Sequence, residues 1–209
     1  MSSQSKMTGI ILAGGKNSRI KPNKAFIRIN GAPIIETIVN KFKKLFGEII
    51  IVANSAGDYE YLGVKLVKDI IYGGGPLGGL YAGLVNSKSK YNFAVACDMP
   101  FLNTKLIEYM KSGISSYDAL IPKLRNGYEA LHAIYSKKCV PVIEKQLNDN
   151  NLRIIDLLPR IRVKIFRETA LKKFDPLLIS FFNLNTNADY RRALEIRPRF
   201  KNTSSGYKY

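Results

Sequence analysis

The stretch that decides the fold is Gly9–Lys24, which reads GIILAGGKNSRIKPNK. It opens with an apolar run, Ile10–Ala13, that has the length and composition of a buried parallel strand. Gly14 and Gly15 follow at once. Because a glycine pair lets the backbone turn sharply and approach a ligand closely, the stretch predicts a strand followed by a tight turn at a binding site.

The loop behind the glycine pair is basic and carries Lys16, Arg19, Lys21 and Lys24. Backbone N–H groups in such a turn can hold an anion, and Arg and Lys can close over a polyphosphate. A solvated basic loop without a ligand is the alternative, and this stretch alone does not separate the two. It is no P-loop, because Lys16 is followed by Asn17 instead of a hydroxyl residue, and it lacks the dinucleotide fingerprint.

Composition points to one domain with an anionic partner. The chain has 209 residues, 46% of them hydrophobic, and we expect a single domain over 1–196 with a basic, loosely attached tail over 197–209. The net charge of +17 suits a nucleotide, a phosphorylated small molecule, nucleic acid or a membrane surface.

Two features of the sequence predict a cytoplasmic protein. Cys97 and Cys139 are far apart and have no metal-ligand spacing, which favours free thiols in a reducing compartment. Met1–Thr8 does not resemble a signal peptide, and no apolar run is long enough for a membrane helix.

Strands and helices are expected to alternate along most of the chain. Strands are predicted at Ile10–Ala13, Ile49–Ala53, Val64–Val67, Phe93–Cys97, Ala119–Pro122, Tyr128–Tyr135 and Ile161–Phe166. Helices are predicted at Pro33–Phe46, from Leu80 onward, at Asn103–Lys111, at Cys139–Leu147, and from Thr186 or Asn187 to about Ile196. This order predicts an α/β fold, a three-layer α/β/α sandwich with a mainly parallel, Rossmann-like sheet.

Four residues come directly after predicted strands, namely Gly14, Asn54, Asp69 and Asp98. Ligands of such sheets bind at the carboxyl ends of the strands, so these residues are expected to share a site. Asp98 is the candidate ligand for Mg²⁺, which is commonly held by one or two carboxylates together with phosphate oxygens and water. A helix cap or an ordinary strand end is the alternative for Asp98.

The glycine-rich stretch Gly73–Gly79 is predicted to be a loop. Its backbone groups, unobstructed by side chains, suit the approach of a purine base or a ribose, and Asp69 could accept hydrogen bonds from a base edge. A surface loop is the alternative. His132, the only histidine, lies among apolar neighbours and is predicted to be a core residue.

Several motifs together resemble those of the molybdenum cofactor guanylyltransferases, nucleotidyltransferases with a glycosyltransferase-A-like fold. The resemblance covers about Gly9 to Leu194. Its motifs are Leu12-Ala13-Gly14-Gly15 with Arg19 and Lys24, Asn30-Gly31-Ala32-Pro33, Asp69 with Gly75-Pro76-Leu77-Gly78-Gly79, Cys97-Asp98-Met99-Pro100-Phe101, His132-Ala133-Ile134-Tyr135, and Phe182-Asn183-Leu184-Asn185-Thr186.

The resemblance implies Mg²⁺-dependent transfer of GMP from GTP to the phosphate of molybdopterin, with release of pyrophosphate. Arg19, Lys24 and Asp98 would be catalytic, with Asp98 holding the metal. The nucleotide-binding residues would be Leu12, Ala13, Gly14, Gly15, Lys24, Asn54, Asp69, Gly75, Pro76, Leu77, Gly78 and Asp98. Asn183 and Asn185 would face the pterin, and proteins that insert the molybdenum cofactor are expected partners.

Two alternatives remain open at this stage. A related nucleotidyltransferase could use CTP or activate another phosphorylated metabolite. A non-catalytic basic protein could bind nucleic acid through the C-terminal cations Arg191, Arg192, Arg197, Arg199 and Lys201. No nucleic-acid-binding motif accompanies these cations, so a solvated basic face is the preferred interpretation.

Overall fold

The computed structural model describes residues 7–14, 24–71 and 73–196. Eight strands form one sheet: β1 (Thr8–Leu12), β4 (Glu48–Val52), β5 (Lys65–Val67), β6 (Tyr91–Ala96), β7 (Ala119–Leu124), β8 (Gly127–Tyr128), β9 (His132–Ser136) and β10 (Val163–Arg167). The order is β10-β7-β9-β6-β1-β4-β5, and β8 pairs with β7. The central pairs β4–β1 and β1–β6 are parallel, and β9 runs antiparallel to both of its neighbours.

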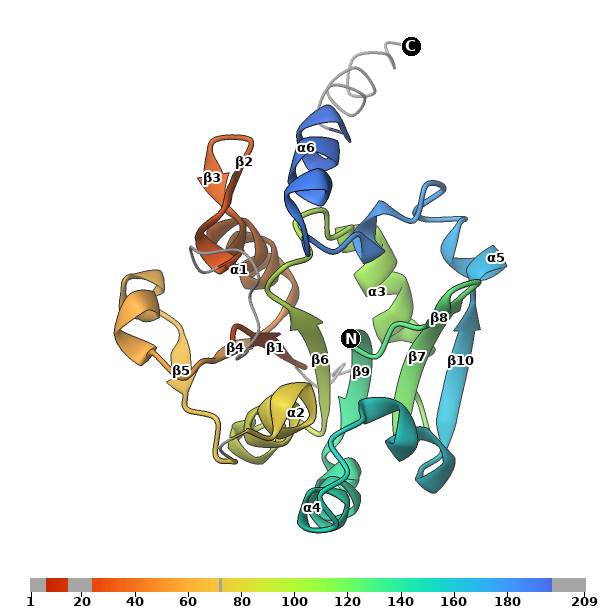
Figure 1. Cartoon of the computed structure of the whole chain (residues 1–209). Coiled ribbons are helices and arrows are strands. Elements are labelled where there is room, and N and C mark those ends of the chain that lie inside the picture. Colours follow the sequence, from red (N-terminus) through yellow and green to blue (C-terminus); the bar gives the residue numbers. More distant parts are fainter. Residues whose placement is uncertain (1–6, 15–23, 72, 197–209) are drawn as a thin grey trace.

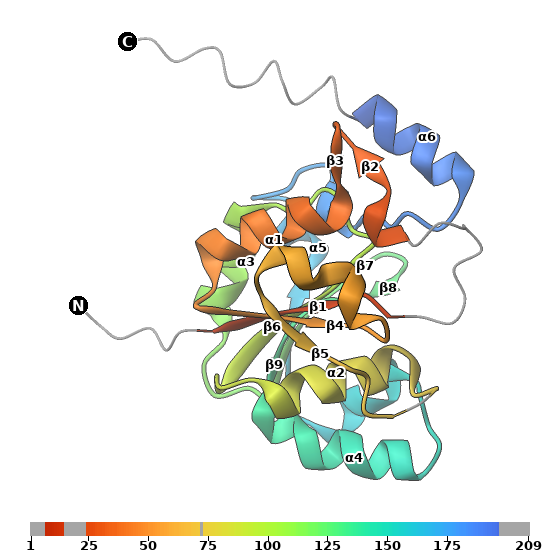
Figure 2. The same ribbon diagram turned by 90° about the vertical axis from the view of Figure 1, so that its left-hand side faces the viewer.

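The helices are α1 (Ile34–Leu45), α2 (Gly75–Asn86), α3 (Thr104–Gly113), α4 (Val140–Asn148), α5 (Glu168–Leu171) and α6 (Asn187–Ile196). Short 3₁₀ turns are η1 (Lys24–Phe26), η2 (Ala56–Leu62), η3 (Lys137–Cys139), η4 (Ile154–Arg160) and η5 (Ile179–Phe181). Figure 2 shows α1 and α3 on one face of the sheet and α2 and α4 on the other. The predicted three-layer sandwich with a mainly parallel sheet is therefore confirmed.

Each face of the sheet has its own hydrophobic core. Ile11, Phe42 and Phe93 belong to the core beneath α1 and α3, whereas Ile10 and Leu80 belong to the core beneath α2 and α4. The alternation of Ile10 and Ile11 between the two cores follows from the two-residue period of a strand. A strand that is apolar on both faces is thus explained by helices on both sides.

The prediction for α2 was wrong at its start. The helix begins at Gly75, five residues before Leu80, so Gly75–Gly79 is helical and is not a loop. Pro76 suits a first helical turn, and the buried Leu77 gives that turn an anchor in the core. Burial of this turn outweighs the low helix propensity of glycine.

The predicted strand Tyr128–Tyr135 is in fact two strands. β8 ends at Tyr128 and β9 begins at His132, with a turn in which the His132 N–H donates to the Glu129 carbonyl oxygen at 3.1 Å. Elsewhere the predicted elements are present with ends shifted by a few residues. The hairpin of β2 (Arg28–Ile29) and β3 (Ala32–Pro33) turns at Asn30 and Gly31, both of which have positive φ.

The predicted tail over 197–209 lies outside the described residues. Across the described part of the chain, no helix has both the length and the apolar character needed to cross a membrane.

Candidate active site

The candidate site surrounds the carboxyl end of β1. From β1 the chain first adds β4 and β5 on one side and then crosses by way of α2 to add β6 on the other side. Leu12 is in register with Val52 and with Ala96, and the Cys97 N–H donates to the Leu12 carbonyl oxygen at 3.0 Å. Such a switch of direction opens a crevice where α/β proteins bind ligands. Gly14 and Asp98 therefore lie at one edge of the sheet.

The residues predicted to bind the nucleoside lie around this end of β1. A Cβ atom placed on Gly14 would lie 3.9 Å from Asn54 Nδ2, and one placed on Gly79 would lie 3.4 Å from Leu12 Cδ2. The first turn of α2 therefore packs beside the end of β1. The Leu12 side chain faces this turn from β1, and Asn54 lies beside Gly14.

Asp69 lies against the same turn of α2. A Cβ atom on Gly78 would lie 3.1 Å from Asp69 Oδ1, and this oxygen accepts a hydrogen bond from the Ile71 N–H at 3.1 Å. Burial raises the pKa of Asp69, and the Ile71 N–H opposes this rise. The first N–H groups of a helix lack partners within the helix, so the start of α2, at Gly75 and Leu77, adds hydrogen-bond donors beside a carboxylate acceptor.

Asp98, Lys24 and Asn185 form a second group at this edge. Lys24 Nζ lies 3.5 Å from Asp98 Oδ2 and donates to Asn185 Oδ1 at 2.8 Å. The side chains of Lys24 and Asp98 are only 14% and 19% exposed. Burial raises the pKa of Asp98, and the neighbouring Lys24 ammonium opposes this rise. Among the described residues, Asp98 Oδ1 is buried and has no hydrogen-bond partner.

The other predicted site residues do not join either of these two groups through a hydrogen bond or ion pair given by the structure, or they lie outside the described residues. Asn183 donates to the Phe181 carbonyl oxygen at 3.2 Å, and thus bonds within its own segment. Gly15 and Arg19 lie outside the described residues, so the structure does not test their predicted roles. Ala13 is tied into the sheet through its N–H, which donates to the Val52 carbonyl oxygen at 2.9 Å.

Two supporting residues were not found by sequence reasoning. Asp189 accepts hydrogen bonds from the N–H groups of Asn185 and Thr186 at 3.0 and 2.9 Å and thereby fixes the backbone at Asn185. The Thr186–Asp189 spacing is a capping-box pattern that could have revealed it. Tyr59 stacks on Phe26, with ring centroids 5.3 Å apart, beside the turn that carries Lys24, and no motif marks this contact.

Two further side chains near this edge, His132 and Cys97, are held in their neutral forms. His132 lies between Phe93 and Phe181, as predicted for a core histidine, and burial lowers its pKa to about 3. Burial raises the pKa of the Cys97 thiol to about 12, so this thiol stays protonated at neutral pH. Neither side chain is suited to acid–base or nucleophilic work here.

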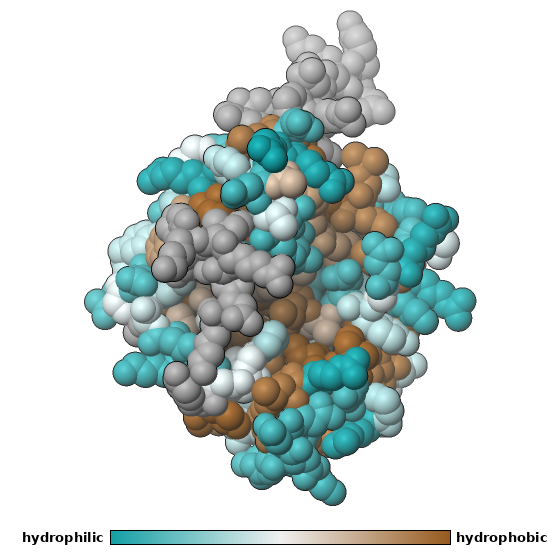
Figure 3. All heavy atoms as spheres, viewed as in Figure 1, coloured by the Kyte–Doolittle hydropathy of each residue, from teal (hydrophilic) through white to brown (hydrophobic). Residues whose placement is uncertain are grey.

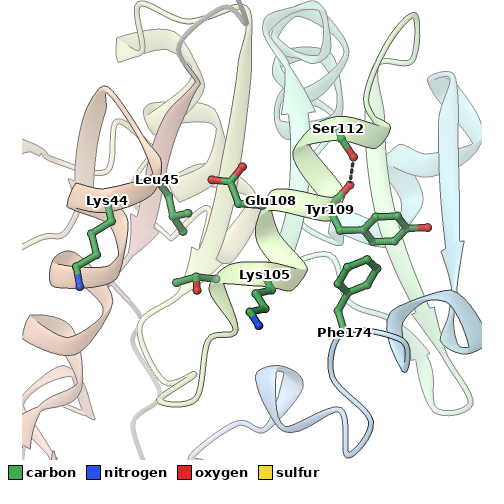
Figure 4. Close-up of a pocket in the computed structure, with 8 residues that line it drawn as sticks. Lys44, Leu45, Lys105, Glu108, Tyr109, Ser112 and Phe174 are labelled. Carbon is green, nitrogen blue, oxygen red and sulfur yellow. Dashed lines mark hydrogen bonds between the residues drawn. The ribbon is translucent and has the colours of Figure 1, made fainter. Parts of the chain in front are cut away.

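A pocket of about 550 Å³ lies between α1 and α3, where none of the predicted site residues contributes to its lining. Figure 4 shows Tyr109 and Phe174 facing one another there, with ring centroids 4.3 Å apart. In the view of Figure 3, hydrophobic side chains gather toward the middle of the face and hydrophilic ones around its rim. Burial and charge near Asp98, and not pocket volume, therefore locate the candidate site.

A carboxylate with a buried oxygen and a neighbouring cation, at the switch point of a Rossmann-like sheet, are features of a nucleotidyltransferase. Residues 9–160 match the family described as MobA-like NTP transferase domain. The chain belongs to this family.

Relatives agree in both sequence and structure. The molybdenum cofactor guanylyltransferase of Desulfosudis oleivorans is 36% identical over 189 residues, which cover 90% of this chain and 94% of that protein. A probable molybdenum cofactor guanylyltransferase of Pelotomaculum thermopropionicum is 35% identical over 186 residues, 89% of this chain and 91% of the relative. The crystal structure of molybdopterin-guanine dinucleotide biosynthesis protein A from Archaeoglobus fulgidus superposes with a TM-score of 0.80 at 30% identity, covering 91% and 98% of the two chains.

Proposed function

We propose that this nucleotidyltransferase transfers GMP from GTP to the phosphate of molybdopterin and releases pyrophosphate. The observation that carries the proposal is the meeting of Lys24, Asp98 and Asn185 at the carboxyl edge of the sheet. The names of the similar proteins support the choice of GTP and molybdopterin as substrates.

GTP and the acceptor would bind on two sides of the carboxyl edge of the sheet. Leu12, Asn54 and Asp69, together with the first turn of α2, suit the guanosine because they offer apolar surface, amide groups and a carboxylate around the end of β1. Lys24, assisted by Arg19, suits the triphosphate. Asn183 and Asn185 suit the acceptor, because their segment approaches Asp98 from the C-terminal part of the chain: the Leu184 N–H donates to the Asp98 carbonyl oxygen at 3.0 Å.

Asp98 fits a magnesium ion. Its buried Oδ1 has no partner among the described residues, and a cation would satisfy it. In the described part of the chain, no group of three or more His, Cys, Asp or Glu side chains could hold a metal. One carboxylate together with triphosphate oxygens and water is a common Mg²⁺ environment. When bound, the ion would supply positive charge next to the phosphates.

The reaction brings two anions together. An oxygen of the acceptor phosphate attacks the α-phosphorus of GTP, the bond from this phosphorus to the bridging oxygen breaks, and pyrophosphate leaves with that oxygen. The residues at this edge neutralise charge and align the groups, which requires no nucleophilic side chain. Lys24 lies where it can offset negative charge on the phosphates as it develops.

The decisive experiment is pyrophosphate release with GTP, CTP, ATP and UTP, each with and without molybdopterin. We expect release with GTP only when molybdopterin and Mg²⁺ are both present. Release with CTP, or with a different phosphorylated acceptor, would reassign the substrate within the same class. Salt-sensitive RNA or DNA binding that survives Asp98→Ala, without any nucleotide turnover, would favour the non-catalytic alternative.

A further inference from the structure

Asn185 contacts Lys24 from 161 residues away in the sequence. Its Oδ1 accepts a hydrogen bond from Lys24 Nζ at 2.8 Å, while the same Nζ lies 3.5 Å from Asp98 Oδ2. Asn183, which belongs to the same motif, is bonded to the Phe181 carbonyl oxygen instead. The two asparagines therefore have different surroundings, and only Asn185 contacts the group expected to meet the triphosphate.

The segment that carries Asn185 is fixed by contacts that do not involve Lys24. The Asn185 N–H donates to Asp189 at 3.0 Å, and the Leu184 N–H donates to the Asp98 carbonyl oxygen at 3.0 Å. The Leu184 side chain is fully buried. The backbone at Asn185 is thus held in place by its neighbours, whereas lysine is a long side chain that loses much rotamer freedom when it is ordered.

An amide holds a lysine in a different way from a carboxylate. A Lys ammonium has three N–H donors and no acceptor. Asn185 takes one donor and Asp98 faces the ammonium at a longer distance, which leaves donor capacity for a phosphate oxygen. Because the amide is neutral, it orients the ammonium without cancelling its charge.

We propose that Asn185 is a positioning residue for Lys24, through which the C-terminal segment tunes the binding of the nucleotide triphosphate. This inference rests on the proposed function for the placement of the triphosphate at Lys24. It extends the role of Asn185 beyond the acceptor, because it predicts that loss of Asn185 weakens GTP binding even when no acceptor is present.

The test is a double-mutant cycle on the dissociation constant of GTP, measured by calorimetry without molybdopterin, both with Mg²⁺ and in excess EDTA. Asn185→Ala should weaken GTP binding roughly tenfold, which is about 1.4 kcal/mol. In a Lys24→Met background the same change should have almost no effect, because Asn185 acts through the ammonium. Asn185→Asp should also weaken binding, since a carboxylate keeps the contact but cancels the charge.

The matched control is Asn187→Ala, the same substitution at an exposed position two residues further on, which should leave GTP binding unchanged. Asn185 is itself exposed, so its variants should fold, and thermal melting checks this. Equal GTP affinity in Asn185→Ala and the unsubstituted protein, or an equal loss in the Lys24→Met background, would overturn the inference. If the cycle shows coupling but no GMP reaches molybdopterin, the proposed function fails while the positioning role stands.

Discussion

The two oxygens of the Asp98 carboxylate have different surroundings. Oδ2 faces Lys24, and Oδ1 is buried without a hydrogen-bond partner among the described residues. A buried acceptor without a partner costs free energy, which a bound cation would recover. The sequence predicts a carboxylate at the end of a strand at this position. The structure further shows that one of its oxygens is buried and that the Lys24 ammonium lies next to the other.

The first prediction concerns Asp98→Asn. We expect kcat/KM for pyrophosphate release from GTP and molybdopterin to fall by roughly 10²–10³, because the neutral amide no longer holds a cation beside the phosphates. Asp118→Asn is the control, since Asp118 pairs with Arg162 at 3.3 Å next to β7 and takes no part in the candidate site. Near-normal turnover by Asp98→Asn would contradict the assignment of Asp98.

The second prediction concerns the pH dependence of stability. Burial lowers the pKa of His132 from 6.5 to about 3, so between these values the unfolded chain binds a proton that the folded chain does not. The stability contributed by neutral His132 is complete above pH 6.5 and is lost as the pH falls toward 3. As the pH falls from about 6 to about 4, the free energy of unfolding should decline less steeply in His132→Leu than in the unsubstituted protein. The expected difference between the two slopes is about 1.4 kcal/mol per pH unit.

Urea unfolding of both proteins across this pH range measures the difference. His132 is the only histidine, and comparing the two proteins cancels the contributions of the carboxylates. Both ring nitrogens of His132 are buried without hydrogen-bond partners among the described residues, so leucine should not lower stability at neutral pH. Parallel pH profiles for the two proteins would show that His132 does not control this dependence.

At the scale of the elements, α2 is the helix whose packing the sequence did not reveal. A Cβ atom on Gly83 would lie 2.6 Å from Ile10 Cγ2, so this glycine allows α2 to approach β1 closely. The same helix brings Gly78 against Asp69 and Gly79 against Leu12. The glycines of α2 therefore serve helix packing, and the close fit of helix and strand positions the residues that are proposed to face the nucleoside.

The third prediction is that Gly83→Ala destabilises the protein although alanine is the better helix former. Overpacking costs about 1–3 kcal/mol, and the better helix propensity of alanine offsets about 1 kcal/mol of this cost, so we expect a net loss of up to about 2 kcal/mol in the free energy of unfolding. Gly57→Ala in η2 is the control, because its Cβ atom would meet nothing within 4 Å, and we expect a change within about 0.5 kcal/mol. A stabilised Gly83→Ala protein would show that β1 and α2 are not tightly packed.

Element boundaries were harder to predict than element types. The start of α2 was placed at Leu80 because glycine disfavours helices locally, but the burial of Leu77 extends the helix to Gly75. The break between β8 and β9 depends on tertiary contact, since the Glu129 N–H donates to the Pro122 carbonyl oxygen of β7 at 2.9 Å. The periodicity of one segment contains no information of this kind, because these contacts are made to other elements of the fold.

At the scale of the whole molecule, the C-terminal part returns to the site formed by the first half of the chain. Figure 1 shows α6 beside the hairpin of β2 and β3, on the side of the sheet that carries α1 and α3. Ala193 of α6 is fully buried in the core shared with these helices. Segments from both ends of the described chain thus meet at Lys24 and Asn185.

The fourth prediction is that deletion of residues 197–209 leaves the enzyme working. The cores of the described structure are built from residues up to Ala193, so we expect the free energy of unfolding to change by no more than about 0.5 kcal/mol. Pyrophosphate release with GTP and molybdopterin should likewise persist. Loss of turnover together with loss of RNA binding would instead assign the basic tail a direct role.

The sequence by itself determined the order of strands and helices and the polar residues at the strand ends, because apolar periodicity and turn chemistry are local properties. Only the tertiary structure decided that Asn185 contacts Lys24, that α2 begins at Gly75 and that Asp98 keeps one buried oxygen without a partner among the described residues. These features depend on packing and burial between segments far apart in the chain, and no local pattern encodes them.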